Sequence, residues 1–332
     1  MSLNSGIRMM RTLMLVLAVS TLVAPMCDAA QETASDLLMG MSHASRQLNY
    51  EGVFVYRRDG QSDTIRLEHI FKAEKEKERL VSMSGPEREL IRDDGLVAFR
   101  DGALAEGKFA PAPQAFKGEF TAATLSTLSQ NYDFTLGDIE RVAGRVARFL
   151  SMTPKYADRY AHRLWLDVET RLPLKSEIAS VDGEILEQVE FAQLNILEEV
   201  EEDMIATLTS TVSVRNENAG SMLEIDNQIS EPAWNVAWLP PGFEMAEQKS
   251  TRIAGGRGHL TSFMYSDGLA MVSVYVKSSL EQADTEPSYA VRGAVNVYSR
   301  AIDENEVTVV GDLPMATVQR ISAAIRQLPG QD

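Results

Sequence analysis

Short segments of alternating apolar and polar residues, separated by Asp-Gly pairs, are the feature that most limits how this chain can fold. Residues 50–71 (YEGVFVYRRDGQSDTIRLEHIF) show the pattern on both sides of Asp59-Gly60. Side chains alternate between the two faces of a strand, and Asp-Gly is a favoured turn between paired strands. The segment therefore predicts an antiparallel hairpin.

Similar patterns recur through the first two thirds of the chain. After one amphipathic helix over residues 33–48, they predict strands at residues 89–92, 96–100, 132–136, 141–152, 159–168, 174–180 and 185–194. The run KAEKEKER (residues 72–79) alternates in charge and is interpreted as a solvated loop or strand end. This order of elements predicts an α+β fold whose first domain is a curved sheet or unclosed antiparallel β-barrel with helical cover.

The concave side of such a sheet is a candidate cavity for an apolar ligand. Apolar side chains on the first hairpin are its candidate lining: Val53, Val55, Ile65, Leu67 and Phe71. An open sheet under a single helix leaves apolar area uncovered, so we expect part of this surface to accept lipid. The pattern does not indicate which alternate face points inward.

A polar connection separates this part of the chain from a smaller second part. Residues 198–231 are acidic and then small and polar, with one candidate strand at residues 207–214. We therefore expect a first domain over residues 30–197 and a second over residues 232–332.

The second domain is predicted to be a small α+β unit. Residues 258–278 predict a hairpin with Asp267-Gly268 at its turn, followed by strands at residues 294–299 and 307–311. A final helix begins at Pro314, and its predicted apolar stripe contains Val318, Ile321, Ala324, Ile325 and Leu328.

Two of the three tryptophans, Trp234 and Trp238, lie at the start of this second domain, just before Pro240-Pro241. Two roles are open to them, which are packing of the domain and contact with a partner. Packing is the favoured interpretation, because large aromatic side chains contribute mainly to cores.

The N-terminus has the features of an export signal. Arg8 and Arg11 precede the apolar run LMLVLAVSTLVA, which is too short for a membrane span of about 20 residues. We expect cleavage near Ala29/Ala30 and an exported mature protein. Acylation of Cys27 is the alternative, although Met26 is bulky where a lipoprotein signal has a small residue.

The mature chain offers little catalytic chemistry. Loss of residues 1–29 removes the only cysteine and leaves 30 basic and 47 acidic residues, a balance that argues against a nucleic-acid partner. Residues 102–109 (GALAEGKF) resemble a phosphate-binding loop, but Phe109 replaces the required hydroxyl. Four histidines without metal-ligand spacing complete the inventory. We expect a binding protein without catalytic, metal or cofactor residues.

Five segments, in this order, resemble the MucB/RseB family. They are YEGVFVYRRDG (50–60), RVAGRVARFLSMTPKYADRYAHRLWLDVETRLPLKS (141–176), WLPPGF (238–243), YSDGLAMVSVYV (265–276) and VTVVGDLPMATVQRISAAI (307–325). The resemblance runs from the export signal to the final helix.

The resemblance implies a periplasmic negative regulator of an envelope-stress sigma factor. Its first domain is expected to be similar to LolA and LolB. Its partner would be the periplasmic domain of an RseA/MucA-like anti-sigma factor, which it shields from proteolysis until a lipid or lipopolysaccharide signal relieves the inhibition. A periplasmic lipid or lipoprotein carrier is the alternative, and a homodimer remains open.

Overall fold

The computed structural model describes residues 32–85, 88–93, 96–100, 119–200, 202, 234–252, 258–278 and 286–328. The predicted export signal, the loop at 102–109, the candidate strand at 207–214 and most of the polar connection lie outside these residues.

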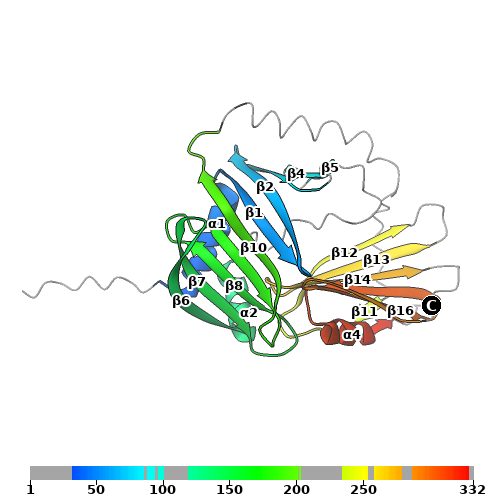
Figure 1. Ribbon diagram of the computed structural model, residues 1–332. Coiled ribbons are helices and arrows are strands. Elements are labelled where there is room, and N and C mark those ends of the chain that lie inside the picture. Colours follow the sequence, from blue (N-terminus) through cyan, green and yellow to red (C-terminus); the bar gives the residue numbers. More distant parts are fainter. Residues whose placement is uncertain are drawn as a thin grey trace, which may run out of the picture. The chain divides into compact units, whose positions relative to one another are not determined.

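Ten antiparallel strands form one open sheet in the first part of the chain (Figure 1). They are β1(Tyr50–Arg58), β2(Gln61–Lys72), β3(Lys75–Ser82), β4(Glu89–Asp93), β5(Leu96–Arg100), β6(Tyr132–Val142), β7(Arg145–Pro154), β8(Ala161–Asp167), β9(Pro173–Ala179) and β10(Ile185–Ile196). Their order is β5-β4-β3-β2-β1-β10-β9-β8-β7-β6, with β5 and β6 at the two edges. The prediction of an unclosed antiparallel sheet is confirmed.

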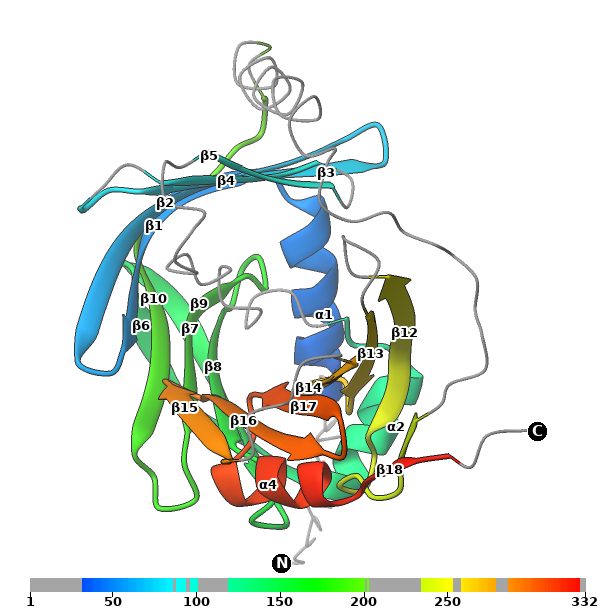
Figure 2. The same cartoon turned by 90° about the vertical axis from the view of Figure 1, so that its right-hand side faces the viewer.

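Two helices cover part of this sheet, where the sequence predicted one. Helix α1(Ala34–Gln47) begins at a capping box made by Thr33 and Asp36, and α2(Ala122–Asn131) begins at a similar one. Figure 2 shows α1 on the concave side of the sheet. The helices share a core with β6, β7 and β8 that includes Leu37, Leu38, Met41, Leu125, Leu128, Tyr132, Leu150, Met152, Leu164 and Leu166.

The structure corrects two strand predictions in this module. The charged run at residues 72–79 is largely strand β3, because its charges pair across the sheet: Arg79 contacts Glu68 and Glu89, and Lys77 contacts Asp93. The predicted strand at residues 141–152 is instead divided between β6 and β7 by a turn at Ala143-Gly144. Both turn residues have positive φ, 51° and 76°, as a tight hairpin turn requires.

A second antiparallel sheet of six strands follows, with order β12-β13-β14-β17-β16-β15. Its strands are β12(Glu244–Arg252), β13(His259–Ser266), β14(Met271–Ser278), β15(Ser288–Arg292), β16(Val295–Ile302) and β17(Asn305–Gly311). Two short strands, β11(Trp234–Val236) and β18(Ile325–Gln327), pair with each other. The predicted hairpin around Asp267-Gly268 is confirmed as β13 and β14.

Helix α4(Met315–Ala323) packs on one face of this sheet and follows Pro314, as predicted. It is shorter than the predicted apolar stripe. Ile325 packs into the same core from strand β18, while Leu328 is 42% exposed. We call β1–β10 with α1 and α2 the N-terminal module, and β11–β18 with α4 the C-terminal module.

No helix among the residues that the structure describes combines the length and apolar character needed to cross a membrane.

Candidate functional site

The five candidate cavity residues do not share one face of the sheet. In the register of β1 and β2, Ile65 lies opposite Phe54 and Leu67 opposite Gly52, on the buried face. Val53 and Val55 point to the other face, where both are half-buried. Phe71 lies on the same face of β2 as Leu67, but it is only half-buried because it is near the end of the strand.

A small apolar cavity lies on the buried face of the N-terminal module. It is lined by Tyr50, Leu67, Leu172, Pro173, Phe191 and Leu194, so Leu67 is the one candidate residue that reaches it. Its volume of about 10 Å³ holds about one water molecule, far less than the several hundred Å³ of a small-molecule site. An acyl chain would require these side chains to move apart.

The two tryptophans have different surroundings. Trp234 is 6% exposed and belongs to the core of the C-terminal module. Trp238 is half-buried at the edge of that core, and the guanidinium of Arg320 lies 3.7 Å from its ring centroid. Trp234 is therefore placed as a packing residue, whereas Trp238 keeps part of its ring open to solvent.

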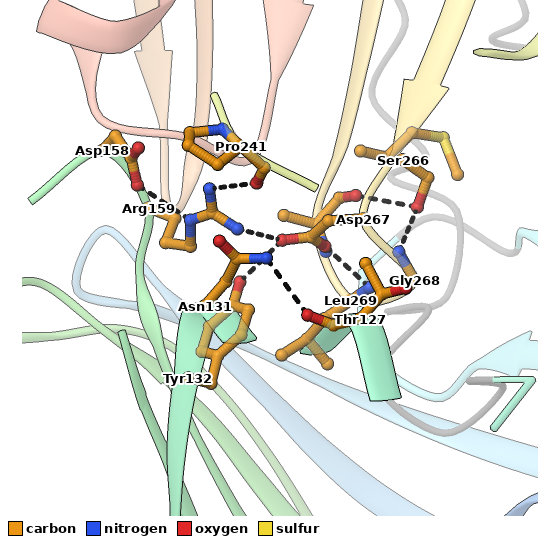
Figure 3. Close-up of polar contacts among 12 residues, drawn as sticks. Thr127, Asn131, Tyr132, Asp158, Arg159, Pro241, Ser266, Asp267, Gly268 and Leu269 are labelled. Atoms are coloured by element: carbon orange, nitrogen blue, oxygen red, sulfur yellow. Dashed lines mark hydrogen bonds and ion pairs between the residues drawn. The ribbon is translucent and has the colours of Figure 1, made fainter. Parts of the chain in front are cut away.

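A buried polar cluster joins the two modules around Asp267, which lies in the β13–β14 turn (Figure 3). Its Oδ1 accepts hydrogen bonds from the backbone N–H groups of Leu269 and Ala270, at 2.9 and 2.8 Å, which fix the turn. Its Oδ2 faces the N-terminal module, where the Tyr132 hydroxyl donates to it at 3.1 Å. One carboxylate thus organises its own turn and contacts the other module.

Arg159, just before β8, supplies the charge that neutralises this carboxylate. Its Nη1 lies 2.7 Å from Oδ2 of Asp267, and both side chains have no solvent exposure. Nη2 donates to the carbonyl of Pro241 at 2.8 Å, while Nε contacts Asp158 at 2.8 Å. The guanidinium also lies 5.5 Å from the Tyr132 ring centroid. Arg159 therefore bridges two separate segments of the C-terminal module.

A second group of polar contacts lies at the β15–β16 turn. Glu187 of β10 accepts a hydrogen bond from the backbone N–H of Ala294 at 3.0 Å, and Asp59 accepts one from Gly293 at 2.9 Å. The amide of Asn296 donates to the Tyr160 hydroxyl at 2.9 Å. Side chains of the N-terminal module thus satisfy backbone groups of this turn directly.

Two glycines allow this close approach. Gly293 has a φ of +59°, and a Cβ there would lie 2.5 Å from Oε1 of Glu187. Gly242 has a φ of +85°, and a Cβ there would lie 2.5 Å from Nδ2 of Asn131. Any other residue at either position would be strained by the positive φ and would force the Glu187 or Asn131 side chain to move.

The contact holds more acidic than basic groups. Desolvation of the half-buried Asp312, reinforced by the charges of Asp267 and Glu187, raises the pKa of Asp312 to about 7, although a hydrogen bond from the Met271 N–H opposes the shift. Burial also raises the pKa of Asp267, while Arg159 and the donors to its carboxylate lower it. The protonation state of Asp312 can therefore change near neutral pH.

Two histidines of the N-terminal module, His69 and His162, are buried. The described residues contain no group of three or more His, Cys, Asp or Glu side chains arranged to hold a metal. His69 contacts the Leu48 carbonyl and Glu76 through its two ring nitrogens. Burial lowers the pKa of His162 to about 4, so this imidazole is neutral at pH 7.

Sequence reasoning missed the residues that join the modules. Asp267 was interpreted only as a turn residue and Arg159 only as the start of a strand, because their contact spans 108 residues. The Asp-Gly pair was the one available signal, and it indicates a turn without indicating what the second carboxylate oxygen contacts.

Comparison with known proteins places the whole chain in one family. Residues 33–209 match the model of the MucB/RseB N-terminal domain, and residues 228–326 match that of the MucB/RseB C-terminal domain. The sigma factor AlgU regulatory protein MucB of Pseudomonas aeruginosa is 32% identical over 323 residues, which are 96% of this chain and 98% of that protein. The sigma-E factor regulatory protein RseB of Haemophilus influenzae is 29% identical and covers 93% of this chain and 96% of its own length.

Solved structures extend the likeness to the fold. MucB in complex with MucA(peri) has a TM-score of 0.69 at 32% identity and covers 90% of this chain and 100% of its own. The Pseudomonas aeruginosa MucA/MucB complex gives a TM-score of 0.70 at 31% identity, covering 89% and 99%. The two domain models, the similar regulatory proteins and the similar solved structures all match this chain over nearly its full length. The chain belongs to the MucB/RseB family of sigma factor regulatory proteins, which are binding proteins and not enzymes.

Proposed function

We propose that this protein is a periplasmic regulator that binds the periplasmic domain of a membrane-spanning anti-sigma factor and shields it from regulated proteolysis. The observation that carries the proposal is the likeness, over nine tenths of the chain, to MucB structures solved with MucA. The apolar run before Ala30 supports export, because it has the length of a signal-peptide core.

The polar contact between the modules supports a regulatory role. A contact built from one buried ion pair and several hydrogen bonds is easier to rearrange than a broad apolar interface. A partner that binds both modules would favour one arrangement of this contact, and a ligand that favours another would weaken partner binding. Such coupling is reciprocal and is typically worth about 1–3 kcal/mol.

A lipid or lipopolysaccharide-like molecule is the proposed opposing ligand. Support comes from the apolar cavity beside Leu67, which lies under the sheet and is closed to about the size of one water. Opening it would move residues of β1, β2, β9 and β10. Asp59 and Glu187, which contact the C-terminal module, lie at the opposite end of the paired strands β1 and β10 from this cavity, so lipid entry would act on the polar contact through movement of these strands.

Isothermal titration calorimetry tests the proposal. The mature chain is titrated into the purified periplasmic domain of the anti-sigma factor from the same organism, and the heat of binding is measured. We expect saturable binding, and we expect a lipopolysaccharide that binds the chain to weaken it by about 5- to 150-fold. Absence of partner binding would refute the regulatory assignment. Partner binding that no lipid changes would remove the sensing part alone.

A further inference from the structure

The contact between the two modules holds more negative than positive side chains. Four carboxylates lie at this contact, two from each module: Asp59, Glu187, Asp267 and Asp312. Arg159 supplies positive charge to it. The nitrogens of this guanidinium already contact Asp267, Asp158 and the Pro241 carbonyl. Arg159 is therefore engaged before a further negative charge is added.

A second arginine, Arg58, lies beside one of these carboxylates. Its guanidinium is 5.1 Å from the ring centroid of Tyr56, and the Tyr56 hydroxyl donates to Glu187 at 2.9 Å. Arg58 thus offsets part of the charge of Glu187 and lies on the side of that residue's phenol partner.

Within the part of the chain that the structure describes, no basic side chain forms an ion pair with Asp312. Asp312 directly follows β17, and its Oδ1 accepts the N–H of Met271 at 2.6 Å. The titratable side chains that interact with it electrostatically are acids and phenols: Asp267, Glu187, Tyr132 and Tyr160. A negative charge on Asp312 is therefore repelled by carboxylates of both modules.

The protonated form of Asp312 avoids this repulsion. Desolvation, followed by the charges of Asp267 and Glu187, raises the pKa of Asp312 to about 7. If the modules separated, more water would reach Asp312 and Glu187 would move away, so the pKa would return toward about 4. The joined modules therefore bind this proton more tightly than separated modules do.

We propose that the contact is a proton-sensitive joint, which holds a proton on Asp312 while the modules are joined and releases it when they separate. Linkage fixes the sign, because protons stabilise the arrangement that binds them more tightly. The joint should be most stable below about pH 4 and should loosen as pH rises to about 7. It is a property of the free chain, and only its use in releasing the anti-sigma factor rests on the proposed function.

Two neighbouring groups do not replace Asp312 in this role. Asp267 accepts four hydrogen bonds, which favour its charged form against the effect of burial. The donors are Leu269, Ala270, Tyr132 and Arg159. His162 lies beside Tyr132, with 6.5 Å between the ring centroids, but burial lowers its pKa to about 4. The imidazole therefore stays neutral over most of the range in which Asp312 titrates.

Hydrogen exchange of the mature chain, without any partner, tests the joint. The backbone N–H groups of Gly293 and Ala294 donate to Asp59 and Glu187 across the contact, so their protection reports joined modules. After correction for the intrinsic pH dependence of exchange, protection of this turn should fall by about tenfold or more between about pH 5 and pH 8.

Asp312→Asn is the main variant, because it keeps an acceptor for the Met271 N–H but cannot ionise. Its corrected protection should be the same at both ends of the pH range and close to the wild-type value in acid. Glu306→Gln is the matched control, since Glu306 lies at the other end of β17 in an exposed pair with Lys277. This control should behave as the wild type does.

Glu187→Gln provides a second variant, which tests the same coupling if Asp312→Asn does not fold. It keeps an acceptor for Ala294 and removes one charge that repels Asp312, so it should make the fall in protection smaller. Corrected protection that does not change with pH in the wild type would overturn the proposal. So would a fall that persists unchanged in Asp312→Asn or in Glu187→Gln. Since the measurement uses the free chain, either result would leave the proposed partner binding standing.

Discussion

The contact between Asp267 and Arg159 predicts a large and specific effect of a single substitution. Asp267→Asn keeps the side-chain shape and the Oδ1 acceptor that holds Leu269 and Ala270. It replaces Oδ2 with an amide that faces two donors, the Tyr132 hydroxyl and the Arg159 guanidinium. The substitution therefore leaves the β13–β14 turn intact and breaks the contact between the modules.

The expected loss is about 3–5 kcal/mol in the free energy of unfolding, the usual cost of removing one partner of a buried ion pair. Both side chains are fully buried, which argues for the upper part of the range. Asp158 still contacts Nε of Arg159 and is 18% exposed, so part of the positive charge stays neutralised. We therefore expect about 3 kcal/mol.

Urea unfolding at neutral pH, followed by tryptophan fluorescence and circular dichroism, measures this loss. Glu306→Gln is the matched control, because Glu306 forms an exposed 3.8 Å pair with Lys277 that should contribute about 1 kcal/mol or less. The double variant Arg159→Met/Asp267→Asn should lose less than the two single losses added together, since it leaves no unpaired buried charge. A loss of under 1 kcal/mol for Asp267→Asn would refute this reasoning.

Four further predictions concern other parts of the chain. Because the folded-state pKa of Asp312 is raised to about 7, this carboxyl should contribute a loss of stability as pH rises from about 4 to 7, opposite in sign to the contribution of His162, whose pKa is lowered to about 4. Asp312→Asn should remove the loss and leave the His162 contribution, so the difference in stability between the two proteins should change with pH; parallel curves for the two proteins would contradict it. Trp234→Ala should lower the free energy of unfolding by about 3–5 kcal/mol, whereas Trp238→Ala should lower it by about 1–2 kcal/mol, measured by thermal or urea unfolding. Equal losses would show that the different solvent exposure of the two rings does not determine their contributions to stability. Limited proteolysis should cut first within residues 198–231 and leave two resistant pieces, and first cuts inside a predicted domain would move the boundary. Intact mass should place the mature N-terminus near Ala30 without an acyl chain, and retention of an acylated cysteine would overturn this.

The antiparallel architecture was predictable because its signals are local. Asp59-Gly60 and Asp267-Gly268 mark turns by residue type, and apolar alternation on both sides fixes strand identity without any long-range information. The final helix was predicted from its apolar spacing. Its end was not, because Ile325 continues the spacing while pairing as a strand with Val236.

Charged and polar elements were missed for a different physical reason. Strand β3 looks solvated in isolation, yet Arg79 finds Glu68 and Glu89 on the neighbouring strands. A charge that is paired across a sheet is indistinguishable in sequence from one that faces water. Helix α2 has a Ser- and Thr-rich sequence with a sparse apolar stripe, so periodicity did not reveal it.

The candidate site was the least predictable part. The apolar cavity residues were chosen from the first hairpin, but the register divides them between two faces and brings Leu67 together with Leu172 and Phe191 from distant strands. The contact between Arg159 and Asp267 depends on tertiary structure alone. Local patterns predicted the strands, whereas the polar contact depends on how the two modules are placed.

The central proposal, that this chain shields an anti-sigma factor from regulated proteolysis, is tested most directly by the rate at which the protease that makes the first cut in that factor's periplasmic domain cleaves it. The measurement compares the domain alone with the domain saturated by the mature chain. We expect saturation to slow cleavage strongly, and Asp267→Asn to weaken this protection while leaving an unrelated substrate of the protease unaffected. Cleavage at an unchanged rate under saturating binding would contradict the claim.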